Sequence, residues 1–159
     1  MELFAEDMGR VAKMCVTEKG AEFKSIAPKK VGNVEIAIVG KAKMVVCHNA
    51  TMDELKRLLQ DSEKRAAIKD AWVLVADGEY CEEFAELVHP YVTIVKSGES
   101  KEESEKYEQF SRGWNVEDAQ GVYAHRKVLP VGKNESVEVL FGESRENPIG
   151  LLNIKCLTA

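Results

Sequence analysis

Two side chains suited to covalent and acid–base chemistry are adjacent in the chain, at Cys47 and His48. A cysteine in the loop before a helix can have its pKa lowered by the helix dipole, so that the nucleophilic thiolate is available near neutral pH. His48 could act as an acid, a base or a ligand if its side chain points to the same side of the strand as Cys47. Neighbouring residues on an extended strand point to opposite faces, so the two need not be partners. The alternative is that Cys47 ends a buried strand and that His48 and Asn49 are turn residues.

A second group of candidate residues is acidic. Asp77 and Glu79 flank Gly78, directly after an apolar run. Two carboxylates at such a position could bind Mg²⁺ through their oxygens, or perform acid–base catalysis if burial raised one pKa. The alternative makes Asp77 a helix cap and places Glu79 in the first turn, where the helix dipole favours acids. No spacing of cysteines and histidines matches a recurrent zinc pattern, so we assign no metal ligands.

Two further segments offer groups that suit an anionic ligand. Lys96, Ser97 and Gly98 precede a predicted helix, and such a loop can cradle a phosphate, although neither GxxxxGK[ST] nor GxGxxG occurs in the chain. His125 and Arg126 lie in the most basic short stretch and could close a site from a different strand. The alternatives are a plain capping loop for the first segment and a solvated strand face for the second.

The elements that must position these residues follow from the apolar pattern. Short apolar runs between turn residues predict strands at 11–17, 21–26, 34–39, 44–47, 71–76, 91–95, 122–129, 136–141 and 151–156. A capping box at Thr51 and Glu54 begins a helix that runs to about residue 70. Further helices are predicted at 79–88 and 100–112. Three strand–loop–helix units therefore follow one another from residue 44 to residue 112, with connections short enough for parallel right-handed crossovers.

These elements predict one domain over residues 1–159 with an α/β fold. The expected architecture is a three-layer Rossmann-like core, in which a mixed sheet takes parallel strands from the middle third of the chain. Antiparallel strands come from the N- and C-terminal parts, and those of the C-terminal part are either added to one edge of the core sheet or form a small side sheet. Ligands of such sheets bind beyond the carboxyl ends of the parallel strands, where helix N-termini point. We therefore expect one crevice, with catalytic residues Cys47, His48 and Asp77 and ligand contacts from Asn49, Thr51, Gly78, Lys96, Ser97, Gly98, His125 and Arg126.

Composition limits the class of protein and its partners. The 159 residues are 45% hydrophobic and 31% charged, as in ordinary globular domains. A net charge of −5 argues against nucleic acid or an anionic membrane surface as the main partner. No apolar run approaches the roughly 18 residues of a membrane span, and the acidic start lacks the features of a signal peptide. We therefore expect a cytoplasmic protein whose four cysteines do not form a disulfide framework and of which at least two are small buried hydrophobic residues.

The sequence is compatible with two hypotheses about function. The first is a small cytosolic α/β metabolic enzyme or ligand-binding protein. It would act on a small anionic metabolite or nucleotide-like molecule as a transferase or hydrolase, with Mg²⁺ as the one cofactor considered. The second is a non-catalytic subunit or homo-oligomeric module, such as a homodimer, because an antiparallel tail leaves an edge strand that must be covered.

Overall fold

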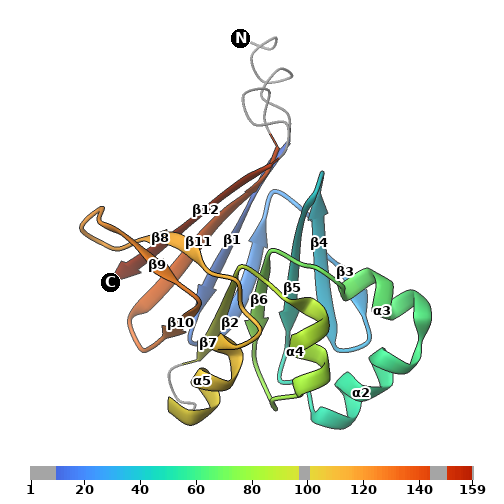
Figure 1. The fold of residues 1–159 in the computed structure, drawn as a ribbon. Helices are drawn as coiled ribbons and strands as arrows, with labels where there is room; N and C mark the ends of the chain where they lie inside the picture. The colour runs from blue at the N-terminus through green and yellow to red at the C-terminus, as the bar shows by residue number, and fades with distance from the viewer. Residues whose placement is uncertain (1–9, 97–100, 144–149, 159) are drawn as a thin grey trace.

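Two six-stranded sheets form most of the molecule, and the chain passes between them several times (Figure 1). This computed structural model describes residues 10–96, 101–143 and 150–158. We call the first sheet the central sheet; its strands, in spatial order, are β10 (Val128–Val131), β7 (Val92–Lys96), β6 (Val73–Ala76), β5 (Ala42–Cys47), β4 (Val34–Val39) and β3 (Lys29–Val31). We call the second the flanking sheet; its order is β2 (Gly20–Lys24), β1 (Val11–Thr17), β11 (Glu135–Gly142), β12 (Leu151–Thr158), β8 (Trp114–Glu117) and β9 (Tyr123–Arg126).

The central sheet combines both strand directions. Its strands β5, β6, β7 and β10 are parallel to one another, whereas β3 and β4 pair antiparallel beside β5. The flanking sheet is antiparallel except for the short contact between β12 and β8. The carboxyl ends of four neighbouring strands therefore lie at one edge of the central sheet.

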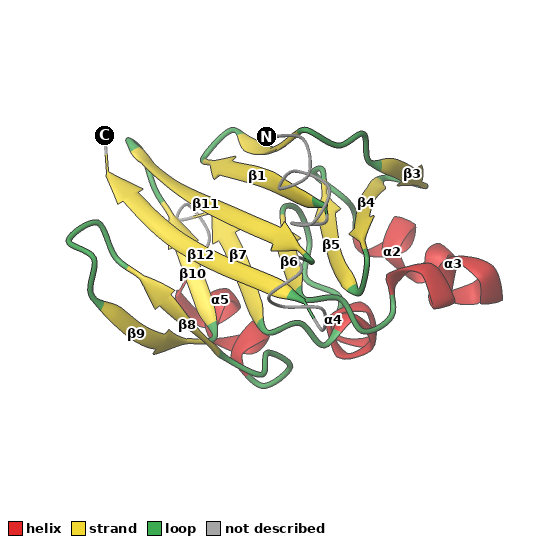
Figure 2. Ribbon diagram, turned by 90° about the horizontal axis from the view of Figure 1, so that it is seen from above, coloured by secondary structure: helices red, strands yellow, loops and turns green. Residues whose placement is uncertain are grey.

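Both faces of the central sheet are covered, but by different partners. Met44 and Val46 of β5 belong to a core shared with the flanking sheet, whereas Val45 and Cys47 belong to a core shared with the helices. The helices of the described residues are α2 (Met52–Gln60), α3 (Ser62–Ile68), α4 (Glu82–Val88) and α5 (Lys101–Glu108). Figure 2 shows the helices on the side of the central sheet away from β1. Burial on both faces explains why β5 and β6 are almost continuously apolar.

The mixed α/β class and the parallel strands of the middle third are confirmed, and the Rossmann-like three-layer arrangement is not. The third layer is a second sheet, which joins strands from the two ends of the chain: β1 pairs with β11 along its whole length, and β11 pairs with β12. The strand predicted at 122–129 is also divided. The chain leaves the flanking sheet after Arg126 and enters the central sheet at Val128, where β10 pairs parallel to β7 rather than antiparallel.

All three predicted helices have different bounds in the structure, and the one expected at 100–112 ends at Glu108. The helix expected from residue 51 to residue 70 is interrupted at Asp61, whose side chain accepts hydrogen bonds from the N–H groups of Glu63 and Lys64 and so caps a second helix. The helix expected from residue 79 begins at Glu82, because the preceding residues pair with the loop after β5. No helix in the described ranges is long and apolar enough to cross a bilayer.

Candidate functional site

The carboxyl ends of β5 and β6 do not open into the expected crevice. Beyond the strands, Ala50 N–H donates to the Asp77 carbonyl at 3.0 Å, and Glu79 N–H donates to the Ala50 carbonyl at 2.8 Å. Ala50 and Gly78 thereby extend the parallel pairing of the two strands, and we call this pairing the seam. The space left between this seam and the helices is only about 10 Å³, which is room for one water molecule at most.

Cys47 lies inside this closed region. It is 5% exposed, and burial raises the pKa of its thiol to about 12, although a backbone hydrogen bond at Asp77 acts in the opposite direction. This shift is opposite to the one predicted from the helix dipole, and its largest cause is burial, which disfavours the charged thiolate. Cys47 is therefore a neutral buried thiol near pH 7, and the structure gives no support for its use as a nucleophile.

Asp77 forms an ion pair with the last residue of the neighbouring strand β7. Its carboxylate forms an ion pair with Lys96 at 3.2 Å, and the Asp77 side chain is largely buried. The acid does not cap α4, whose N-cap is Cys81 without a side-chain hydrogen bond. Glu79, the other acid of the pair, accepts a hydrogen bond from Met52 N–H at 3.2 Å and so helps to cap α2. Within the described residues, no cluster of three or more acidic, histidine or cysteine side chains could hold a metal ion.

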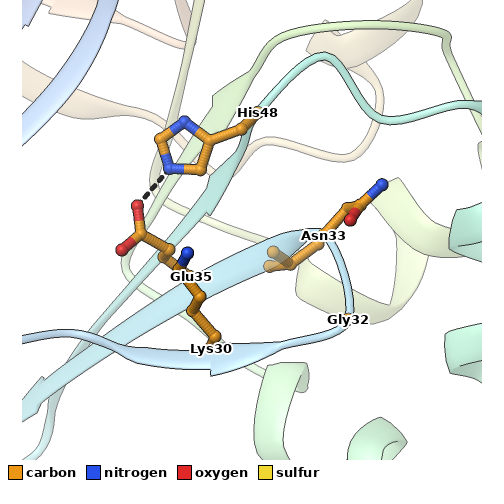
Figure 3. A pocket seen from close by; sticks show the side chains of 6 residues that line it. Lys30, Gly32, Asn33, Glu35 and His48 are labelled. Carbon is orange, nitrogen blue, oxygen red and sulfur yellow. Dashed lines mark hydrogen bonds and ion pairs between the residues drawn. The ribbon is translucent and has the colours of Figure 1, made fainter.

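His48 lies on the other side of the same strand end, in an open pocket of about 330 Å³ (Figure 3). The pocket is lined by Lys30, Gly32, Asn33, Val34, Glu35 and His48. Glu35 is on β4 and faces Lys30 of β3 in the strand register. His48 follows β5, and its N–H donates to the Asn33 carbonyl at 3.4 Å. Three adjacent strands therefore bring a lysine, a carboxylate and an imidazole together.

The central contact of this pocket joins His48 Nε2 to the Glu35 carboxylate (Figure 3). The side chains are 41% and 20% exposed, respectively, so a ligand can reach them from solvent. A carboxylate accepts hydrogen bonds, so Nε2 is the donor and Nδ1 carries the lone pair of the neutral ring. A histidine oriented in this way can take up a proton at Nδ1, while the carboxylate stabilises the resulting imidazolium. Lys30 adds a positive charge to the wall.

The turn between β3 and β4 shapes the pocket and requires a glycine. Gly32 has a φ of +62°, in the left-handed region, and a Cβ at this position would lie 2.8 Å from Leu58 Cδ2. The turn therefore packs directly on α2. This contact fixes the wall of the pocket that carries Asn33, and it connects the pocket to the helix layer.

The remaining predicted residues are divided among several places. Thr51 forms the predicted capping box: its side chain accepts from Glu54 N–H at 3.2 Å, and its own N–H donates to Glu54 Oε1 at 3.0 Å. Asn49 is exposed, with a φ of +50°, as expected for a turn residue. Gly78 is in the seam. Ser97 and Gly98 lie outside the described residues.

His125 and Arg126 are not part of the His48 pocket. They belong to β9, the edge strand of the flanking sheet, where every residue is exposed. Arg126 Nη2 donates to the Val128 carbonyl at 3.4 Å, and its side chain lines a separate cleft beside β10. Since β10 and β3 are the two opposite edges of the central sheet, this cleft and the His48 pocket are at opposite ends of the row of strands.

Glu35, Lys30 and Asn33 were missed by the sequence analysis. Glu35 was visible as the one charged residue in an otherwise apolar strand, Val34–Val39. A charge in such a strand is costly to bury unless it has a partner, so its presence indicated one. Which residue would be the partner depends on strand pairing, and the spacing along the chain did not reveal it.

Comparisons of the chain with family models, with curated proteins and with solved structures find no match.

Proposed function

We propose that the protein is a small α/β enzyme that acts on a small anionic metabolite, phosphorylated or nucleotide-like, in the pocket around His48. The observation that carries the proposal is the contact of His48 with Glu35 in an open pocket that Lys30 also lines. Its volume of about 330 Å³ lies within the usual range of small-molecule sites, roughly 300–1,000 Å³. The class of reaction is hydrolysis or group transfer with acid–base catalysis.

The roles of the three side chains follow from their chemistry. Lys30 pairs with the anionic group of the substrate. His48 Nδ1 takes the proton of an attacking water or hydroxyl as the new bond to the phosphoryl or acyl group forms, and it returns that proton to the leaving group as the old bond breaks. Glu35 holds the ring and stabilises the imidazolium between these two steps. Mg²⁺ would be bound by the phosphates of a nucleotide substrate, and not by a set of protein ligands alone.

The cellular location is part of the same proposal. The four cysteines are free thiols, which fits a reducing compartment, and we propose the cytoplasm.

Binding is tested by thermal shift with inorganic phosphate, sugar phosphates and nucleotides, each with and without Mg²⁺. A compound that binds the native state raises the melting temperature. We expect Lys30→Met to lose this shift. Lys41→Met, which removes an exposed charge at the far end of β4, should keep it. If no compound stabilises the protein, or if both variants respond equally, the proposed site is wrong.

Catalysis is tested separately with the compounds that bind. We expect His48→Gln to lower the turnover rate by about a hundredfold or more while leaving the binding shift in place, because the proton acceptor is lost and Lys30 is kept. Turnover unchanged in His48→Gln would remove the histidine from the mechanism.

A second candidate function is the non-catalytic homo-oligomeric module, and β9 is the observation that favours it. All four residues of this edge strand are exposed, including Tyr123 at 59%. Such an edge can pair with the same strand of a second copy. Light scattering over a range of concentrations separates the two candidates, because a discrete dimer without any ligand response would favour the module.

A further inference from the structure

A cleft of about 280 Å³ lies between β10 and the flanking sheet, away from the His48 pocket. Its walls come from the outer edge of β10, the start of β11, the end of β12 and the loop between β8 and β9. We propose that this cleft is a second ligand site and that its ligand is a free α-amino acid with an apolar side chain. The inference is independent of the proposed function, because the two sites share no residue.

The floor of the cleft is apolar. Leu129, Val131 and Val137 line it and are each 2% exposed or less, and Pro130 and Leu157 contribute to the walls. An apolar side chain placed here would lose its contact with water, which is favourable by about 25 cal/mol for each Å² buried. The volume is just below the usual range for drug-sized ligands, which suits a molecule of amino-acid size better than a nucleotide.

Arg126 provides a partner for a carboxylate. Among the described residues, its guanidinium makes one hydrogen bond, the long one from Nη2 to the Val128 carbonyl. A guanidinium carries five N–H donors, and two of them can bind both oxygens of a carboxylate side by side. The α-carboxylate of an amino acid has this geometry.

Asp118 and Glu135 provide partners for an ammonium group. Asp118 Oδ1 accepts the N–H groups of Gln120 and Val122 at 2.9 Å each, and Glu135 Oε1 accepts Gly132 N–H at 2.8 Å. These bonds fix the position of both carboxylates. Their second oxygens make no hydrogen bond within the described residues, so they remain available to a cationic group of a ligand.

The charged groups lie around one cleft, because Asp118, Arg126 and Glu135 line it together with Cys156. Burial raises the pKa of the Cys156 thiol, and the three charges also act on it, with Arg126 lowering the pKa and Glu135 and Asp118 raising it. Two acids around one arginine would repel a simple anion. A simple cation would leave the arginine without a partner. A zwitterion offers a carboxylate to the arginine and an ammonium group to the two acids. The apolar floor favours a zwitterion with an apolar side chain.

The test uses alkylation of Cys156 in the full-length protein, followed by mass spectrometry, with L-leucine as the probe. Only the unoccupied fraction reacts, so the alkylation rate should fall about tenfold when leucine is present at about ten times its Kd. N-acetyl-leucine, which lacks the ammonium, and leucinamide, which lacks the carboxylate, should protect far less. Equal protection by either compound, or no protection by leucine, valine or phenylalanine, would overturn the proposal.

Variants assign the effect to the cleft. We expect Arg126→Gln and Glu135→Gln each to abolish protection by leucine. Arg57→Gln, which removes an exposed arginine on α2, should retain it. Both cleft residues are exposed, and unchanged circular dichroism would establish that the variants fold. Protection that persists in Arg126→Gln would contradict the assigned carboxylate partner, and His48→Gln should leave protection unchanged because the other site is separate.

Discussion

The two faces of the sheet at the end of β5 have different surroundings, although the residues that point to them, Cys47 and His48, are adjacent in the chain. On one side, Cys47 faces the helix layer, where the seam between Ala50 and Gly78 leaves almost no space. On the other side, His48 is half-exposed in an open pocket with Glu35. Alternation along the strand separates the two side chains. Reactive residue types therefore mark a site only where the packing leaves room for a ligand and for solvent.

The largest expected effect is on the reactivity of Cys47. With a pKa near 12 instead of the ordinary 9.0, the thiolate fraction at pH 7 falls by about a thousandfold, and so should the rate of alkylation by iodoacetamide. Mass spectrometry of peptides from the native protein measures this rate, and the same protein in denaturant is the control. Alkylation of native Cys47 as fast as free cysteine would mean that the region is not closed.

Gly78 tests the seam through stability. Its φ is +123°, and a Cβ there would lie 2.2 Å from the Ala50 carbonyl oxygen, so we expect Gly78→Ala to lower the free energy of unfolding by about 3 to 5 kcal/mol. Gly20 is the matched control, with a φ of +129° and nothing within 4 Å of its Cβ position. Gly20→Ala should cost only about 1 to 2 kcal/mol. Urea denaturation measures both, and equal losses would show that the close approach is unimportant.

Thr51 tests whether the loop after β5 is structural. We expect Thr51→Ala to lower the free energy of unfolding by about 1 kcal/mol, because Glu54 N–H loses its acceptor at the start of α2. Thr51→Ser keeps the hydroxyl and should lie close to the parent protein. A loss of ligand binding in Thr51→Ala without a loss of stability would instead place Thr51 in a binding site.

The smallest effects on stability are expected at the open pocket around His48. Lys30→Met and His48→Gln should each change the free energy of unfolding by less than about 0.5 kcal/mol, because both residues are exposed. Thermal or urea denaturation of the ligand-free variants measures this. A loss above about 2 kcal/mol in His48→Gln would mean that the contact between His48 and Glu35 stabilises the fold, and His48 would then be as structural as Cys47.

Local features of the fold could be read from the sequence, and distant pairings could not. The capping box at Thr51 and the apolar runs of β5, β6 and β7 are continuous in the chain, so their patterns predicted elements that the structure contains. A small side sheet was one of two alternatives for the C-terminal strands, but the pairing of β1 with β11 in that sheet was not predicted, because the two strands are near opposite ends of the sequence. The same limit applies to the site: His48 was a candidate, whereas its partner Glu35 is brought to it by the antiparallel pairing of β4 with β5.

The pairing of β1 with β11 also has a consequence for the order in which the protein forms during synthesis. Val11 pairs with Gly142, so β1 cannot complete this pairing until residue 142 has left the ribosome. The strands β4 to β7 and helices α2 to α4 are contiguous and can assemble earlier, because their contacts close shorter loops. Until β11 and β12 arrive, the face of the central sheet that carries Met44 and Val46 lacks the part of its cover that Val139, Phe141 and Ile154 supply. Part of this apolar face therefore stays exposed on the nascent chain until β11 and β12 have been made.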